Sequence, residues 1–438
     1  MVFEQKTQIE LGPYKWKNLH RRPIVRGIRN VAYWICEVTA LPATEGGNLI
    51  NVRNKAVSLL ALAALLICAS TAFAQAPSGP IPSSFFGMHV GDAMNWPTVS
   101  IGAMGKGTRV TWSYIEPIQG TRDWTRLDAH VDLAQAHGAR YLQALGGCPC
   151  WAAPVSLQGQ CTPDANGNLA FQGMVNNIQD WDNFVTAMVN RYKGKIDYEL
   201  ANEPDNYFTG TAANMVTLTT HAYNLIRSID PAAIIVAPSY VNASNLDAYY
   251  AAGGVKTIDV NSLHGYPATN NDIAETIQGF LTLPFRTVFS KYGINNKPLW
   301  DTEGSWGNES AGAITDPDLQ VAFVARDYLL HWSFGFSRFN WYLWEDASGG
   351  WGFLLNSSTN KLRPATTAYQ QVYDWMVGAT MTQPCSFNGT DGYHAVYTCD
   401  LTRSGGYQAR VVWNTDGDSA YTAASPIPSV PGLARECK

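Results

Sequence analysis

Short apolar runs alternate with longer helical patterns over most of the chain. Eight runs of apolar and β-branched residues, bounded by turn residues, predict strands at 85–89, 107–112, 139–145, 196–201, 234–238, 259–264, 298–302 and 338–343. Between them, apolar positions three and four residues apart predict helices at 124–137, 179–192, 214–229, 274–292 and 316–334. Strands that alternate with helices indicate βα units and a parallel sheet.

Eight such units favour a closed barrel. The fold class that we predict is therefore α/β, a (β/α)₈ TIM barrel with a small C-terminal antiparallel β module. A doubly wound open sheet is the competing architecture, but it normally carries a glycine-rich turn after its first strand, and residues 87–91 (GMHVG) do not form one. Beyond residue 378, runs at 394–399 and 408–413 alternate as strands around a turn-rich segment at 402–406. The last stretch, 423–438, is proline-rich and shows no strand pattern.

The N-terminal region contains a targeting signal. Arg53 and Lys55 precede an apolar run at 57–67, and a small-residue ending at 72–74 follows it, which is typical of a secretory signal peptide. The run is too short for a bilayer, which needs roughly 20 residues. A buried helix, or an anchor behind a cytoplasmic tail, are the alternatives. We expect secreted or periplasmic localisation, with no stable membrane insertion after cleavage.

The domain organisation that follows has five parts. Residues 1–54 are an uninterpreted extension, 55–74 the signal peptide, 75–84 a proline- and serine-rich linker, 85–378 the catalytic barrel, and 379–438 the β module with its tail.

Composition narrows the class of partner. Only 15% of the 438 residues are charged, and the formal net charge is −5, so no excess of positive charge is available to neutralise phosphates. The chain also contains 15 Trp and 21 Tyr. This composition excludes a disordered chain, argues against nucleic acid and suits a carbohydrate. We expect a monomer.

The cysteines predict disulfides. Export makes them permissible, Cys385 and Cys399 flank a predicted hairpin, and Cys161 is placed to pair with Cys148 or Cys150 across one loop. A metal site at residues 148–150 is disfavoured, because the spacing is not the usual two-residue gap and no histidine pair follows. We expect no metal and no cofactor.

Two glutamates stand where predicted strands end. Glu203 follows the fourth strand and Glu303 the seventh, so in a barrel they face each other across the mouth. Facing carboxyl groups are what glycoside hydrolysis requires, one to protonate the leaving oxygen and one to attack or to activate water. A single strand-end glutamate is more often a solvated side chain, but two at equivalent positions favour chemistry.

Several strand ends together resemble clan A of the glycoside hydrolases, retaining (β/α)₈ enzymes of the family 39 and family 5 kind. The matching stretches are residues 202–204 (Asn-Glu-Pro), Glu303, Arg109 with the pattern at 115–128, residues 264–266 (His-Gly-Tyr) and Trp344. The resemblance covers roughly residues 85–375 and implies a retaining mechanism.

The resemblance also implies a role for each residue. Glu203 is expected to be the acid/base, with its pKa raised by Glu303, and Glu303 to be the nucleophile, kept ionised by Arg109 and by a hydrogen bond from Tyr266. The other expected substrate contacts are Asn202 to the sugar 2-OH, His264 lining the site, Trp344 as a flat face for a sugar ring, and Trp112, Trp151 and Trp306 as further subsites.

These expectations favour an endo-acting enzyme on a neutral poly- or oligosaccharide of the cellulose, β-glucan or xylan type. An exo-acting β-glycosidase such as a β-xylosidase, and a transglycosidase, share the same residues. A carbohydrate-binding barrel without catalysis is the alternative of another class.

Overall fold

A computed structural model describes residues 6–11, 76–92, 95–163, 169–267, 273–277, 282–345, 350–392, 394–415 and 434–437. The predicted signal peptide at 55–74 lies outside these residues, as does the predicted extension at 1–54 apart from 6–11.

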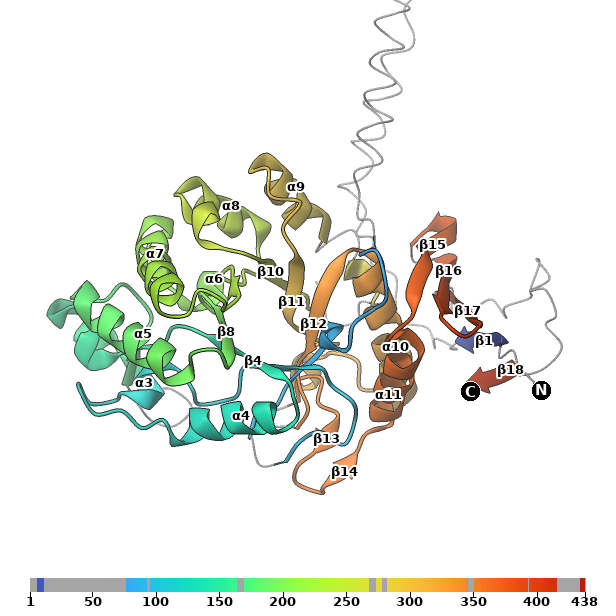
Figure 1. Cartoon of the computed structure of the whole chain (residues 1–438), viewed down its shortest axis with the longest axis horizontal. Helices are drawn as coiled ribbons and strands as arrows, with labels where there is room; N and C mark the ends of the chain where they lie inside the picture. Colours follow the sequence, from blue (N-terminus) through green and yellow to red (C-terminus); the bar gives the residue numbers. More distant parts are fainter. Residues whose placement is uncertain are drawn as a thin grey trace, which may run out of the picture.

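Eight parallel strands form a barrel, with helices around the outside (Figure 1). The strands are β2 (Phe86–His89), β3 (Ala103–Gly105), β4 (Arg140–Ala144), β8 (Ile196–Glu199), β9 (Ile235–Val236), β10 (Asn261–His264), β11 (Leu299–Gly304) and β12 (Phe336–Trp341). The sheet order runs β10-β11-β12-β2-β3-β4-β8-β9, and a parallel bridge between Val236 and Val260 joins its two edges. The predicted (β/α)₈ fold is confirmed.

The second strand is the one that the hydrophobic pattern misplaced. It was predicted at 107–112, but β3 comes earlier, and residues 107–111 form a loop in which Arg109 has a left-handed φ of 63°. Trp112 then begins a short helix, α3 (Trp112–Ile115). The true strand has three residues, Ala-Met-Gly, and contains no β-branched residue that would mark it.

Four of the predicted helices match closely. They are α4 (Thr125–Ala136), α5 (Ile178–Tyr192), α7 (Ala212–Ile229) and α10 (Pro317–Ser333), whereas α9 (Leu283–Lys291) covers only the end of its predicted range. Their starts follow ordinary capping rules. Thr211 and Asn214 form a capping box at α7, and the Asp316 side chain accepts from two backbone N–H groups at α10.

The smaller elements complete the outline. The other α-helices are α6 (Pro204–Tyr207), α8 (Ala243–Ala251) and α11 (Pro364–Met376); 3₁₀ turns lie at Ser83–Phe85, Cys150–Ala152, Val155–Gln160, Gly254–Thr257 and Glu309–Ala311; short strands are β5 (Cys148–Pro149), β6 (Thr162–Pro163), β7 (Leu169–Phe171), β13 (Leu355–Asn356) and β14 (Lys361–Leu362).

A separate sheet follows the barrel along the chain. β15 (Thr380–Asp391), β16 (His394–Arg403) and β17 (Tyr407–Asn414) are antiparallel, and β1 (Lys6–Leu11) and β18 (Ala434–Cys437) add parallel strands at one edge. The expectation that the tail has no strand is therefore wrong at β18. The composition of this segment does not predict a strand, but pairing with β1 supplies its backbone hydrogen-bond partners.

The antiparallel sheet is attached to the barrel by buried polar contacts. The Trp413 indole donates to the Glu275 carboxylate at 2.6 Å, and the Cys385 N–H donates to the Ser333 hydroxyl at 2.8 Å. Trp413 is buried and stacks on Tyr397, with ring centroids 5.0 Å apart. These aromatic side chains are used in packing.

Two disulfides form where the sequence predicts them. Cys385 pairs with Cys399, and Cys161 pairs with Cys150 rather than Cys148, which is buried with a free thiol. Such bonds fit an oxidising compartment. Within the residues described, no helix is both long enough and apolar enough to cross a bilayer.

Candidate active site

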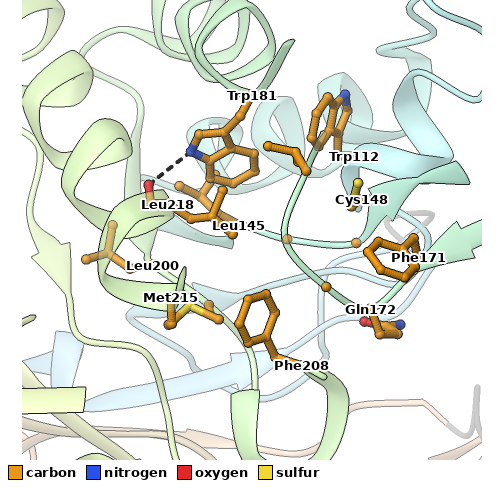
Figure 2. A pocket seen from close by; sticks show the side chains of 15 residues that line it. Trp112, Leu145, Cys148, Phe171, Gln172, Trp181, Leu200, Phe208, Met215 and Leu218 are labelled. Atoms are coloured by element: carbon orange, nitrogen blue, oxygen red, sulfur yellow. Dashed lines mark hydrogen bonds between the residues drawn. The ribbon is translucent and has the colours of Figure 1, made fainter. Parts of the chain in front are cut away.

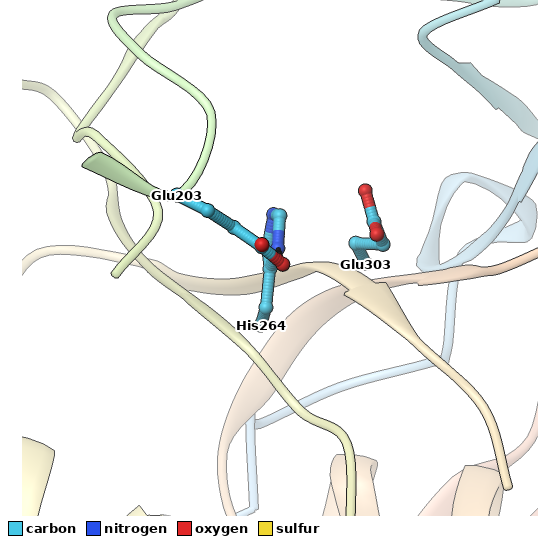
Figure 3. A group of neighbouring side chains, drawn as sticks. All are labelled: Glu203, His264 and Glu303. Carbon is cyan, nitrogen blue, oxygen red and sulfur yellow. Dashed lines mark hydrogen bonds and ion pairs between the residues drawn. The ribbon is translucent and has the colours of Figure 1, made fainter. Parts of the chain in front are cut away.

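Glu203, His264 and Glu303 meet at the carboxyl ends of three barrel strands, β8, β10 and β11 (Figure 3). Glu203 lies in the loop after β8, His264 ends β10, and Glu303 lies in β11. One carboxylate oxygen of each glutamate and a ring nitrogen of His264 all lie within 4.8 Å of one another. The structure therefore brings the two predicted glutamates together.

Glu203 has an unusual backbone conformation. Its φ and ψ of 41° and 61° are left-handed, and it is the N-cap of α6, whose first residue is Pro204. Its N–H donates to the Ser239 carbonyl at 3.0 Å, which ties the loop to the neighbouring strand end. A non-glycine residue in this conformation costs energy, and such costs concentrate at functional sites.

The Glu203 side chain has two partners. His264 Nδ1 lies 2.7 Å from Oε1, and the Asn206 amide donates to Oε2 at 2.8 Å. Burial raises the pKa of Glu203, but the hydrogen bond and charge of His264 outweigh it, so the pKa is lowered. The expectation of a raised pKa is therefore wrong for this resting site. The Glu303 charge does act in that direction, but it is a smaller influence than His264.

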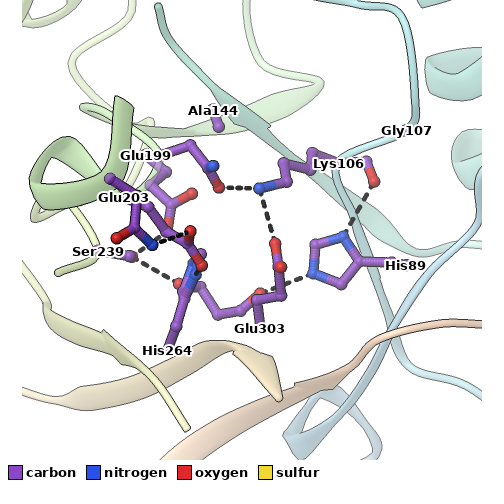
Figure 4. Close-up of polar contacts among 12 residues, drawn as sticks. His89, Lys106, Gly107, Ala144, Glu199, Glu203, Ser239, His264 and Glu303 are labelled. Atoms are coloured by element: carbon purple, nitrogen blue, oxygen red, sulfur yellow. Dashed lines mark hydrogen bonds and ion pairs between the residues drawn. The ribbon is translucent and has the colours of Figure 1, made fainter. Parts of the chain in front are cut away.

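Glu303 lies between a cation and a phenol. Lys106 Nζ is 2.8 Å from Oε2, and the Tyr266 hydroxyl donates to Oε1 at 2.8 Å (Figure 4 shows the lysine contact). Burial alone raises the pKa of Glu303, but Lys106 and the other nearby positive charges hold that pKa well below its usual range. Glu303 is therefore ionised, as expected, and Tyr266 is placed as expected.

The cation beside Glu303 is Lys106, not Arg109. Arg109 is exposed in the loop after β3 and has no recorded contact with Glu303, because the strand ends earlier than predicted. Lys106 is the first residue after that strand and also donates to the Asn202 side-chain oxygen. Burial lowers the pKa of Lys106, but Glu303 and Glu199 more than offset it, and the pKa is raised.

His89, the last residue of β2, is a second residue that the sequence reasoning missed. Its ring nitrogens lie 2.7 Å from the Thr302 carbonyl and 3.0 Å from the Lys106 carbonyl. Burial lowers the pKa of His89 to about 4, so the ring is neutral and donates to one of them. It thereby links the strand ends that carry Lys106 and Glu303 (Figure 4).

Three of the predicted sugar-binding tryptophans are buried. Trp112, Trp306 and Trp344 expose 1%, 1% and 3% of their surface, because the apolar area of each ring packs in the core. Trp151 is partly exposed, and its indole donates to the Glu116 carbonyl at 2.8 Å. The Trp112 indole donates to Glu116 and the Trp306 indole to Glu309, rather than to Glu203 or Glu303.

Other aromatic rings lie beside Tyr266 and His89, the neighbours of Glu303 and Lys106. The Trp351 ring is 5.0 Å from the Tyr266 ring and 6.4 Å from the Tyr342 ring, and Trp351 and Tyr342 are partly exposed. Tyr342 also lies 5.2 Å from the His89 ring. Partly exposed aromatic rings are thus found near Tyr266 at Tyr342 and Trp351, on either side of the buried Trp344 in the sequence.

A cleft of about 290 Å³ is lined by the loops after β3, β4 and β8 and by α7. Lys106 is the one charged side chain among its lining residues, which also include Gln143, Gln172, Asn202 and Tyr207.

An apolar recess of about 50 Å³ adjoins this cleft and shares Leu145, Phe208 and Met215 with it (Figure 2). Trp112 and the free Cys148 line this recess and not the cleft. The predicted subsite residue Trp112 therefore lines a recess behind the cleft.

The glutamates and His264 are also the donor set that a divalent cation would use. Glu303, however, is already ion-paired with Lys106, and Glu203 with His264. A cation would have to displace Lys106, so these contacts fit acid–base chemistry better.

The family model for cellulases, glycosyl hydrolase family 5, matches residues 119–347, more than half of the chain. The chain belongs to glycosyl hydrolase family 5. The resemblance to clan A is thereby confirmed, and membership implies glycosidase activity.

Solved structures support the fold of this family 5 chain. A family 39 glycoside hydrolase from the gut symbiont Bacteroides cellulosilyticus WH2 matches with a TM-score of 0.56 and 17% identity, over 76% of this chain and 71% of that one. A glucosidase from Croceicoccus marinus matches with a TM-score of 0.51 and 14% identity, over 75% and 76%. Among curated proteins, no sequence match was found.

Proposed function

We propose that this family 5 chain hydrolyses β-glycosidic bonds of a neutral poly- or oligosaccharide with retention of configuration. The observation that carries the proposal is the pair Glu203 and Glu303, whose oxygens approach within 4.8 Å. That approach is nearer to the ~5–5.5 Å between the carboxyl groups of retaining enzymes than to the ~6.5–9.5 Å of inverting enzymes.

In the first step, Glu303 is the nucleophile. One of its oxygens attacks the anomeric carbon and forms a glycosyl ester, while the bond from that carbon to the leaving oxygen breaks. Lys106 and Tyr266 hold the carboxylate ionised and oriented beforehand, so little reorganisation is needed at the moment of attack.

The leaving oxygen takes a proton from Glu203. The Glu203–His264 pair holds one proton, since the histidine pKa is raised by the two glutamates against the effect of burial. We propose that this proton passes from His264 Nδ1 to Glu203 and from Glu203 to the leaving oxygen, so the pair delivers one proton in total and is left as a neutral His264 and an ionised Glu203. The lowered pKa of Glu203 is then compatible with a role as general acid.

In the second step, water replaces the leaving group. Glu203 takes a proton from the water, the water oxygen attacks the anomeric carbon from the leaving-group face, and the ester bond to Glu303 breaks. The two inversions together retain the configuration. The Lys106 ammonium stabilises the carboxylate that re-forms.

Residues around the two glutamates and in the cleft are proposed to contact the substrate. Asn202, held by Lys106, is proposed to accept the 2-OH of the sugar, and Tyr342 and Trp351 to provide faces for sugar rings. The single charged lining residue of the cleft supports a neutral substrate, for which we propose endo action. The two disulfides support export to an oxidising compartment, and we propose that the segment at 55–74 directs it.

The test is hydrolysis of β-glucans, xylans and mannans by the purified chain, with the anomer of the first product followed by NMR. Retained β product, shortened chains and no transfer to added acceptors support the proposal. An inverted product contradicts it, transfer without hydrolysis indicates a transglycosidase, and binding without turnover indicates a carbohydrate-binding barrel.

A further inference from the structure

A buried carboxylate lies under the nucleophile and has no part in the steps above. Asp301 precedes Glu303 by two residues in β11 and is fully buried. Its Oδ1 accepts the Glu303 N–H at 3.1 Å and also faces the Gly265 N–H at 3.1 Å. Gly265 is followed by Tyr266, the hydrogen-bond donor to Glu303. One oxygen thus reaches the backbone on both sides of the nucleophile.

The strand pairing explains why this oxygen is needed. Leu263 pairs with Asp301 and His264 with Glu303, so β11 has one extra residue, Thr302, at this point. Such an irregularity removes a backbone N–H from the regular ladder, and a buried N–H without a partner is costly. Asp301 supplies the partner for Glu303, while Gly265 shares its N–H between Asp301 and the Glu303 carbonyl at 3.0 Å.

The close approach of Asp301 also requires a glycine at position 265. A Cβ at Gly265 would lie 1.8 Å from Asp301 Oδ2, a distance that no side chain tolerates. Only glycine lets the carboxylate approach the β10 backbone so closely.

The second oxygen of Asp301 is held by a histidine. His331, on α10, places Nε2 2.9 Å from Asp301 Oδ2 and Nδ1 3.2 Å from Asp327 Oδ1, and its ring stacks on Phe339 at 3.8 Å. Burial lowers the pKa of His331, but the two carboxylates raise it to about 10. The imidazolium is therefore charged over the working pH range and fixes the orientation of Asp301.

We propose that Asp301, oriented by His331, positions the nucleophile Glu303 together with Tyr266. Asp301 and His331 are both positioning residues, because Asp301 contacts the backbone and His331 contacts Asp301, and neither contacts the substrate. The inference rests on the proposed role of Glu303 and adds what holds that side chain in its reacting geometry, where a shift of about 1 Å costs on the order of 10²-fold in rate.

Asp301→Ala removes the acceptor and is expected to lower kcat about 10- to 100-fold with little change in KM. Asp301→Asn keeps an oxygen that can accept the same N–H groups, so it should recover most of kcat. Since alanine leaves His331 buried without its partner, Asp301→Ala is also made with His331→Phe, which retains the stacking on Phe339.

Asp197→Ala is the matched control. Asp197 is likewise fully buried in a barrel strand, is ion-paired with Arg140 at 2.6 Å and accepts the Ile234 N–H at 3.0 Å, but it lies at the start of β8, away from the site. Its loss should lower the melting temperature and leave kcat unchanged.

Hydrogen exchange gives a readout that does not depend on turnover. The Gly265 and Glu303 amides should exchange faster in the Asp301→Ala variants and remain protected in Asp301→Asn. Wild-type protection and kcat in Asp301→Ala, or equal damage in Asp301→Asn and Asp301→Ala, would overturn the inference. If the wild type hydrolyses no glycoside, the proposed function fails, while the exchange data still decide whether Asp301 positions this backbone.

Discussion

The two glutamates of the site have opposite surroundings. Glu303 lies within a barrel strand and faces a fixed cation, Lys106, that cannot readily give up its proton. Glu203 lies on a loop with a left-handed backbone and faces His264, which can. One carboxylate is held ionised permanently, and the other shares a proton with its neighbour.

This difference provides a physical basis for the different roles that we propose for two identical side chains. Pairs of titratable groups whose environments diverge are a recurring basis of acid–base assignment in enzymes. Here the divergence comes from the partner rather than from burial, since both glutamates are largely buried, at 8% and 9% exposure. Substitution of either glutamate or of its charged partner, Lys106 or His264, removes one side of this difference.

The largest expected effect on kcat/KM comes from substituting the two glutamates, and the two variants should differ in how the loss depends on the leaving group of the substrate. Glu303→Gln should reduce kcat/KM on the order of 10⁴- to 10⁶-fold on every substrate, because no ester can form. Glu203→Gln should cost about 10²- to 10⁴-fold on natural glycosides but little on an aryl glycoside whose leaving group needs no proton. Steady-state kinetics on both substrate types measure this.

Another buried glutamate provides the control for the Glu203 and Glu303 variants. Glu116, a third buried glutamate, accepts hydrogen bonds from Trp112 and the Gly120 N–H and shapes a loop. Glu116→Gln should lower stability and spare the leaving-group pattern. Equal sensitivity of Glu203→Gln to both substrates would contradict the division of roles.

The next effect concerns the cation. Lys106→Met removes the charge that holds the pKa of Glu303 low, so the acidic limb of the kcat/KM profile should move to higher pH, with a loss of roughly 10²-fold or more at neutral pH. Arg109→Met is the matched control and should leave the profile unchanged. A shift in the arginine variant instead would restore the original sequence-based assignment.

A smaller effect is expected from the proton donor's partner. Activity is lost on the basic side when the Glu203–His264 pair gives up its proton, and the raised pKa of His264 places this above 6.5. In His264→Gln only Glu203 remains to hold that proton, so the basic limb should move to lower pH, with about a 10-fold loss or more at its optimum. An unmoved basic limb would exclude His264 from the proton pair.

The smallest effect on activity is expected far from either glutamate. Removing the Cys385–Cys399 bond by paired alanine substitutions should lower the free energy of unfolding by about 2–4 kcal/mol and leave kcat unchanged. Denaturant unfolding and kinetics on one preparation measure both. A large loss of kcat with an intact melting transition would mean that the antiparallel sheet contributes to the site.

The fold was largely predictable from the sequence because the pattern repeats. Seven of the eight barrel strands lie where apolar runs stand between helical patterns, and the ends of the fourth and seventh carry Glu203 and Glu303. The second strand failed because Ala-Met-Gly is too short and too weakly apolar to register. Missing it moved the expected cation from Lys106 to Arg109.

Burial of three of the predicted aromatic residues was missed for another reason. Sequence shows that Trp112, Trp306 and Trp344 lie near strand ends, but not which side of the chain each ring faces, and burial decides that. The signal for His89 and Lys106 was present, since each lies at the end of a barrel strand or directly after one. Asp301 and His331 meet only in three dimensions, and no spacing reveals them.

The most direct test of the central claim is azide rescue of the two glutamate variants, with the product configuration determined by NMR. The account predicts that Glu303→Gly yields a glycosyl azide of inverted configuration, because azide enters from the vacated nucleophile face. It predicts that Glu203→Ala yields an azide of retained configuration, because azide replaces water on the glycosyl ester. The opposite pairing of variant and configuration would contradict the roles assigned here.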